Sequence, residues 1–156
     1  MVDVGTGIGD FALFAAQVDN TRILAFEPFP ESFALLSENQ ILNEVSNVEV
    51  YSETVGEEGG IQHLVTTGRE SLKTRSHHDP LADISTQTQV RARPLLEIFD
   101  SHLLESFDLL KMDCEGCEYD VLMVSPVESL LKKSGSFWNT MINTHHTSMR
   151  SCMIFF

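Results

Sequence analysis

The stretch "VDVGTGIGD" at residues 2–10 constrains the fold most, because a short apolar run leads directly into glycines at positions 5, 7 and 9. Glycine allows the chain to turn tightly and brings the backbone close to its neighbours. The following letters, "DFALFAAQV", place Phe11, Phe14 and Val18 at roughly helical spacing. The pattern predicts a strand over residues 1–4, a glycine turn and then a helix.

The same alternation of strand and helix continues along the chain. "RILAFEP" is a second apolar run that stops at Pro28, and "PESFALLSENQILNE" is a helix that begins with a proline suited to its first turn. "NVEVYSE" and the buried run "FDLLKMD" are further strands, and a helix is predicted from "CEYDVL" to about residue 133, interrupted near Pro126. Such alternation predicts an α/β fold, a Rossmann-like three-layer sandwich around a mostly parallel sheet.

Two regions show less pattern. Residues 59–89 are polar and are interpreted as a long loop with one edge strand over residues 61–65, before a strand end and a short helix in "VRARPLLEIF". The tail holds one predicted strand over residues 140–144 and lacks the hairpin that would complete a seven-stranded sheet. We expect one domain over residues 1–156, without the usual lead-in before its first strand, and shortened or divergent over residues 132–156.

Composition narrows the classes of partner. The formal charge of −13 repels a phosphate backbone, and the ten Lys and Arg residues are scattered, so nucleic acid is not expected as a partner. No run approaches the roughly 18 apolar residues of a membrane span, and the start lacks a secretory pattern. Three cysteines are an odd count that fits a reducing compartment. We therefore expect a soluble, cytoplasmic protein without a membrane span.

Polar residues gather where the predicted strands end, which is where parallel sheets bind ligands. The third glycine comes four positions after the first and is followed by Asp10, whereas a dinucleotide fingerprint places it five positions after. A carboxylate there disfavours a pyrophosphate and suits an ammonium or sulfonium group. Glu27, 22 residues after Gly5, ends the second strand, where it can accept hydrogen bonds from ribose hydroxyls. The combination predicts an adenosine-type ligand.

These motifs resemble the S-adenosyl-L-methionine-dependent methyltransferases and, among them, the FkbM family. The resemblance rests on "VDVGTGIGDFALFAA", "AFEPFPESFALLSENQILN" and "DLLKMDCEGCEYDVL", the last matching a Lys-x-Asp-x-Glu-Gly-x-Glu signature, and covers about residues 2–124. It implies S-adenosyl-L-methionine as cofactor. The residues implied to bind or orient it are Asp3, Gly5, Thr6, Gly7, Gly9, Glu27, Pro28, Phe29 and Asp113, with close helix packing an open alternative for Gly9.

The predicted catalytic residues lie in "KMDCEGCEYD" at residues 111–120. A hydroxyl acceptor must lose a proton as it is methylated, which calls for a base near the acceptor. Asp113 is the first candidate to orient or deprotonate it, and Glu115 is expected to contact the acceptor or the charged end of the cofactor; either acid could instead cap the next helix. Lys111 is included as a residue that pairs with one of these acids or extends to solvent.

Cys114 and Cys117 form a Cys-x-x-Cys pair, but packing is the favoured interpretation of both. Redox chemistry is disfavoured because the neighbouring acids raise a thiol pKa, and a zinc site lacks a full set of spaced ligands. No metal is predicted. The resulting prediction is an O-methyltransferase for a hydroxyl on a small molecule, sugar or lipid headgroup; the alternatives are a methyltransferase-like binding or scaffold module and, less favoured, a thiol or metal protein.

Overall fold

The computed structural model describes residues 1–66, 86–104, 107–114, 121, 139–142 and 152–155. The helix predicted from "CEYDVL" onward lies outside these residues. No helix within the described ranges is long and apolar enough to cross a membrane.

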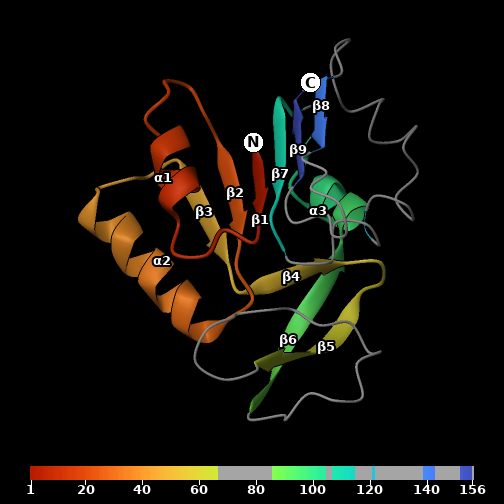
Figure 1. Cartoon of the computed structure of the whole chain (residues 1–156). Coiled ribbons are helices and arrows are strands. Elements are labelled where there is room, and N and C mark those ends of the chain that lie inside the picture. The colour runs from red at the N-terminus through yellow and green to blue at the C-terminus, as the bar shows by residue number, and fades with distance from the viewer. Residues whose placement is uncertain (67–85, 105–106, 115–120, 122–138, 143–151, 156) are drawn as a thin grey trace.

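A six-stranded sheet forms the centre of the molecule (Figure 1). Four neighbouring strands run parallel, while the last two are antiparallel to their neighbours. This mostly parallel sheet confirms the predicted α/β class. In sheet order the strands are β3 (Val48–Tyr51), β2 (Ile23–Phe26), β1 (Val2–Val4), β7 (Leu109–Met112), β9 (Cys152–Phe155) and β8 (Asn139–Ile142).

Helices cover both faces of this sheet, as the apolar runs of its strands require. Along β2 the side chains alternate: Ile23 and Ala25 pack with Ala12 of α1 (Asp10–Ala15), and Leu24 and Phe26 face the other way. That second face packs against α3 (Leu95–Ser101). The helix α2 (Pro30–Leu42) begins with proline at its first position, as expected, and follows β2.

A second sheet was not predicted. It consists of β4 (Glu53–Gly56), β6 (Thr86–Pro94) and β5 (Gly60–Thr66), in that order. The edge strand expected over residues 61–65 is part of β5, but residues 86–89, interpreted as loop, belong to β6 and pair with β5. The polar letters "TQTQ" hid this strand because its stability comes from cross-strand pairing rather than from an apolar face.

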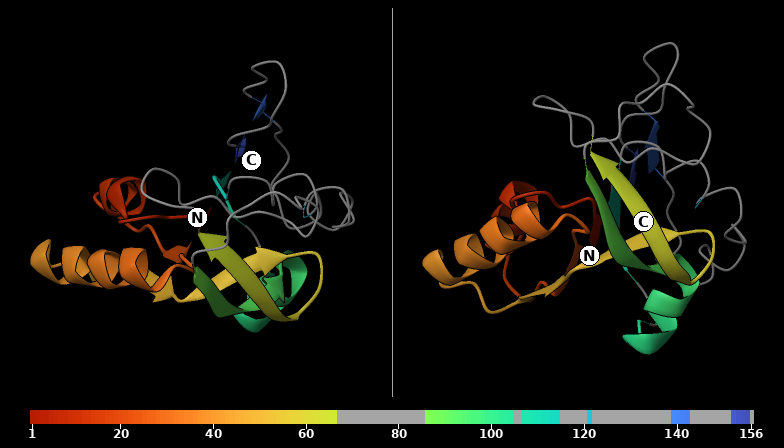
Figure 2. Two further views of the ribbon diagram at one scale, coloured as in Figure 1. Left: turned by 60° about the horizontal axis from the view of Figure 1, so that its bottom comes forward. Right: turned by 90° about the horizontal axis from the view of Figure 1, so that it is seen from below.

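The second sheet lies beyond the carboxyl ends of the parallel strands (Figure 1). Seen from below in Figure 2, it comes to the front of the molecule. Arg93 of β6 ties it to α3, because the guanidinium contacts both Glu53 at 3.2 Å and Glu97 at 3.2 Å. The edge of the main sheet where ligands are expected therefore has a wall contributed by the second sheet.

The tail of the chain differs from the sequence-based expectation. The strand predicted over residues 140–144 overlaps β8 (Asn139–Ile142), but the expected absence of a hairpin was wrong, because β8 pairs antiparallel with β9 and β9 pairs antiparallel with β7. Each of these strands has only four residues, too few to show a clear period. The sheet is thus extended beyond β7 by one strand that was predicted, β8, and by one that was not, β9.

Candidate functional site

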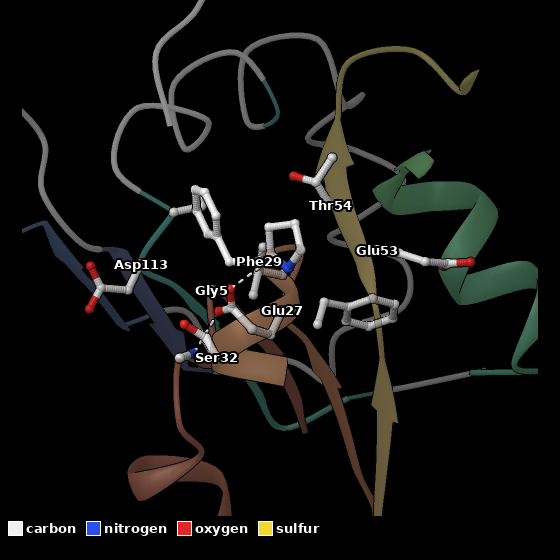
Figure 3. Close-up of a pocket in the computed structure, with 12 residues that line it drawn as sticks. Gly5, Glu27, Phe29, Ser32, Glu53, Thr54 and Asp113 are labelled. Atoms are coloured by element: carbon white, nitrogen blue, oxygen red, sulfur yellow. Dashed lines mark hydrogen bonds between the residues drawn. The ribbon is translucent and has the colours of Figure 1, made fainter. Parts of the chain in front are cut away.

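A pocket of about 190 Å³ opens where β1, β2 and β7 end, next to β4 of the second sheet (Figure 3). This volume is below the roughly 300–1,000 Å³ of most small-molecule sites. The described residues therefore account for part of a binding site. The pocket is lined by Val4, Gly5, Gly7, Phe26, Glu27, Pro28, Phe29, Ser32, Glu53, Thr54, Asp113 and Cys114.

Gly5 is required by the close approach of three strand ends. Its φ of 74° lies in the left-handed region, and its N–H donates to the carbonyl of Phe26 at 2.9 Å. A Cβ at this position would stand 2.2 Å from the backbone oxygen of Asp113. On the other side, the N–H of Asp113 donates to the carbonyl of Val4 at 2.9 Å. The glycine turn is thus packed directly onto the end of β7.

Gly7 and Gly9 have different roles. Gly7, at φ 62°, lines the pocket and its N–H donates to Oε2 of Glu27 at 2.8 Å. Gly9 precedes α1, and a Cβ there would lie 2.4 Å from Cδ1 of Leu36 in α2. Of the two interpretations left open for Gly9, the structure shows close helix packing.

Glu27 is the acid at the centre of the pocket. It is 4% exposed, and Oε1 accepts a hydrogen bond from the N–H of Phe29 at 2.9 Å while Oε2 accepts from Gly7. Burial raises the pKa of Glu27, and the two backbone N–H groups partly oppose this rise. An ionised carboxylate has about four acceptor sites, so two remain for a ligand. Glu27 thus lies directly after β2, where it was predicted, and lines the pocket.

Asp3 and Lys111 lie beside the pocket rather than in it. They are directly opposite each other on β1 and β7, and the Lys111 Nζ is 2.9 Å from Asp3 Oδ1. Asp3 is fully buried, and burial raises its pKa although Lys111 opposes the shift. Lys111 also sits over the ring of Phe11, 5.6 Å from its centroid. Lys111 thus pairs with Asp3, an acid that was not among its predicted partners.

Thr6 was implied to be a cofactor-binding residue. It is buried, does not line the pocket, and its hydroxyl donates to the backbone oxygen of Asp3 at 3.0 Å. Together with Asp3 it supports the glycine turn from below. Neither residue lines the pocket, and Asp3 faces the side of the sheet opposite to its neighbours Val2 and Val4.

Asp113 is exposed and lies at the rim of the pocket. In Figure 3 its carboxylate points away from Glu27, toward the outside. This position leaves the carboxylate accessible to a second molecule approaching the rim. Glu115, the other predicted acid, lies outside the described residues.

Pro28 and Phe29, two of the residues implied to bind the cofactor, both line the pocket. Phe29 is buried and packs with Leu64 and Val90 of the second sheet. Phe29, two residues after Glu27, therefore links the main sheet to the second one.

Ser32 and Thr54 were not predicted. Both line the pocket and are nearly buried, with exposed fractions of 5% and 4%. Glu53, the residue before Thr54, contacts Arg93 through its carboxylate, which points away from the pocket (Figure 3). The alternation of side chains along a strand could have indicated Thr54, had β4 been recognised.

Cys114 lines the pocket and is disulfide-bonded. Cys114 also belongs to the buried core, as the packing interpretation expected, but that interpretation did not include the disulfide. Within the described ranges, no cluster of three or more His, Cys, Asp and Glu side chains could hold a metal ion.

Comparison with known proteins gives the family. Residues 3–150 match the model described as the methyltransferase FkbM domain. A curated relative, Methyltransferase 1 of Beauveria bassiana (strain ARSEF 2860), is 29% identical over 140 residues, which are 78% of this chain and 56% of the relative. The chain thus spans about half the length of that relative.

A solved structure shares the fold. The FkbM methyltransferase of Methylobacillus flagellatus KT superposes with a TM-score of 0.53 at 15% identity, covering 100% of this chain and 43% of the other. The family match extends over nearly the whole sequence and includes both the glycine turn and the stretch at residues 111–120. The chain therefore belongs to the FkbM family of methyltransferases.

Proposed function

We propose that this chain binds S-adenosyl-L-methionine in the Glu27 pocket and methylates a hydroxyl of a small molecule, sugar or lipid headgroup. The observation that carries the proposal is Glu27, a buried acid held by two backbone N–H groups with acceptor sites to spare. Ribose hydroxyls are donors of the kind these sites accept. Family membership supports the same cofactor.

The residues present fit a cationic nucleoside cofactor. Glu27 would hold the ribose, Pro28 and Phe29 would lie along the base, and the turn at Gly5 and Gly7 would face the amino-acid end. When bound, the cofactor supplies an electrophilic methyl group. The carboxylates of Glu27 and Asp113 make the pocket favourable for its positive charge.

Asp113 is proposed to act on the acceptor. Its residue is exposed at the rim, and its backbone is held at the end of β7 by the hydrogen bond from its N–H to the carbonyl of Val4. A carboxylate so placed can orient the acceptor hydroxyl and take its proton as the oxygen is methylated. The choice of a hydroxyl rests on the family resemblance together with this accessible acid.

The proposal is tested by calorimetric titration of the purified chain with S-adenosyl-L-methionine and S-adenosyl-L-homocysteine. Binding in the micromolar range should be lost in Glu27→Ala and kept in Glu38→Ala, which removes an exposed acid from the middle of α2. A folded wild type that binds neither ligand would contradict the proposal.

A second candidate is a methyltransferase-like module that binds the cofactor without catalysis. One observation favours it: Lys111, one of the three predicted catalytic residues, forms an ion pair with Asp3. Methyl transfer to any hydroxyl acceptor, abolished by Asp113→Asn while cofactor affinity stays unchanged, would exclude this candidate.

A further inference from the structure

Thr54 occupies an unusual place in the pocket wall. It lies on β4, pairs with Ala92 of β6, and is only 4% exposed although it lines the pocket. In Figure 3 its hydroxyl oxygen is directed toward the interior of the pocket. Among the described residues this hydroxyl makes no hydrogen bond. The oxygen is not fully buried, so it can be reached from the pocket, where a ligand group can take the place of water.

The orientation of Thr54 is enforced by its neighbours. Side chains alternate along a strand, so Glu53 and Val55 must lie on the opposite face from Thr54. The carboxylate of Glu53 contacts Arg93 at 3.2 Å, and Val55 is buried in the core that α3 also joins. A slip by one residue would remove both interactions. The register of β4 therefore holds the Thr54 hydroxyl in the pocket.

The strand order shows which part of a ligand it meets. Proceeding along the sheet, Asp113 and Gly5 lie at the ends of β7 and β1, Glu27 follows at the end of β2, and β4 continues from β3. A ligand whose ribose binds Glu27 has one end near Gly5 and the other near Thr54. Pro28 and Phe29 supply apolar surface at the pocket, which suits a planar base.

We propose that the Thr54 hydroxyl hydrogen-bonds the edge of the purine base and thereby contributes to the selection of an adenosine ligand. This inference rests on the proposed cofactor. A hydroxyl both donates and accepts, so it can pair with a ring nitrogen or with an exocyclic amino group. Being neutral, it adds no charge to the base end of the pocket, whereas the acids that favour a cation lie at Glu27 and Asp113.

The test compares Thr54→Val and Thr54→Ser with the wild type in titrations with S-adenosyl-L-homocysteine and 5′-methylthioadenosine. The second ligand retains the base and ribose but lacks the amino-acid end. Thr54→Val should weaken both ligands by the same factor, about tenfold, because one ligand group is left without its partner. Thr54→Ser, which keeps the hydroxyl, should restore most of the affinity for both.

Thermal unfolding of the free protein separates this role from a structural one. Valine has the same shape as threonine and suits a strand, so Thr54→Val should leave the Tm of the free protein unchanged or raised. Unchanged affinity in Thr54→Val, or a loss for S-adenosyl-L-homocysteine alone, would overturn the inference. Absence of any binding by the wild type would overturn the proposed cofactor itself, and this inference with it.

Discussion

Lys111 of β7 and Asp3 of β1 form a cross-strand ion pair of 2.9 Å directly beneath the glycine turn. The two residues are 108 positions apart in the chain, yet they are register partners in the parallel sheet. Asp3 is fully buried and Lys111 is 11% exposed at its side chain, so the pair is largely removed from water. The second carboxylate oxygen of Asp3, Oδ2, has no hydrogen-bond partner among the described residues. The pair therefore stabilises the turn only while both members are present.

Lys111→Met should destabilise the protein by about 3 kcal/mol, because the buried carboxylate of Asp3 loses the cation that pairs with it. The double variant Asp3→Asn with Lys111→Met removes both charges and should recover part of that loss. Urea unfolding of the three proteins measures the effect. If Lys111→Met is as stable as the wild type, the pair does not hold the turn in place.

The stability contributed by Glu27 should decrease as the pH rises from about its ordinary pKa of 4.5. Burial raises the folded-state pKa, so between the ordinary and the raised value the folded state binds more protons than the unfolded state. Unfolding free energies of the wild type should therefore fall with pH across that window more steeply than those of Glu27→Gln. Parallel pH profiles for the two proteins would show that the folded-state pKa is not raised.

Ligand binding should show the opposite dependence on pH. Ribose hydroxyls donate to the ionised carboxylate, so affinity for S-adenosyl-L-homocysteine should weaken on acidification through the raised pKa of Glu27. Titrations at a series of pH values, with unfolding monitored in parallel, give the pH at which half of this affinity change has occurred. A midpoint at or below the ordinary value of 4.5 would count against the buried acid as the ligand-binding group.

Gly5→Ala should be far more disruptive than Gly7→Ala. A Cβ at Gly5 meets the backbone oxygen of Asp113 at 2.2 Å, whereas a Cβ at Gly7 meets no atom within 4 Å. Both positions have positive φ, which costs about 1–2 kcal/mol for alanine, so Gly7→Ala serves as the matched control. Gly5→Ala should lower the free energy of unfolding by more than this amount, because the added Cβ forces β1 and β7 apart. Equal Tm values for the two variants would argue against the close approach.

Asp113→Asn should lower methyl transfer by about 10²–10⁴-fold, the usual contribution of a general base, and leave cofactor affinity nearly unchanged. Asp108→Asn is the matched control, since it changes an exposed aspartate just before β7, at the other end of the strand. The rates are measured with whichever hydroxyl acceptor is first found active. Loss of cofactor binding in Asp113→Asn would indicate that Asp113 binds the cofactor and not the acceptor.

The tail and the second sheet show where prediction from sequence failed. β9 is too short to display a period, and β6 begins with the polar residues "TQTQ". These strands form because partners distant in the chain supply their hydrogen bonds. Local composition contains no record of those partners, so the loop was wrongly extended over residues 86–89 and the hairpin was missed, while residues 67–85 lie outside the described ranges.

The sequence by itself determined the strand–turn–helix units, the parallel sheet and the position of Glu27, since glycine placement, apolar period and the end of a strand are local properties. Tertiary structure decided which side chains meet at that edge. It paired Lys111 with Asp3, turned Glu53 toward Arg93 and directed Thr54 into the pocket. Each of these outcomes depends on the register between strands far apart in the chain, which is set by long-range packing and hydrogen bonding.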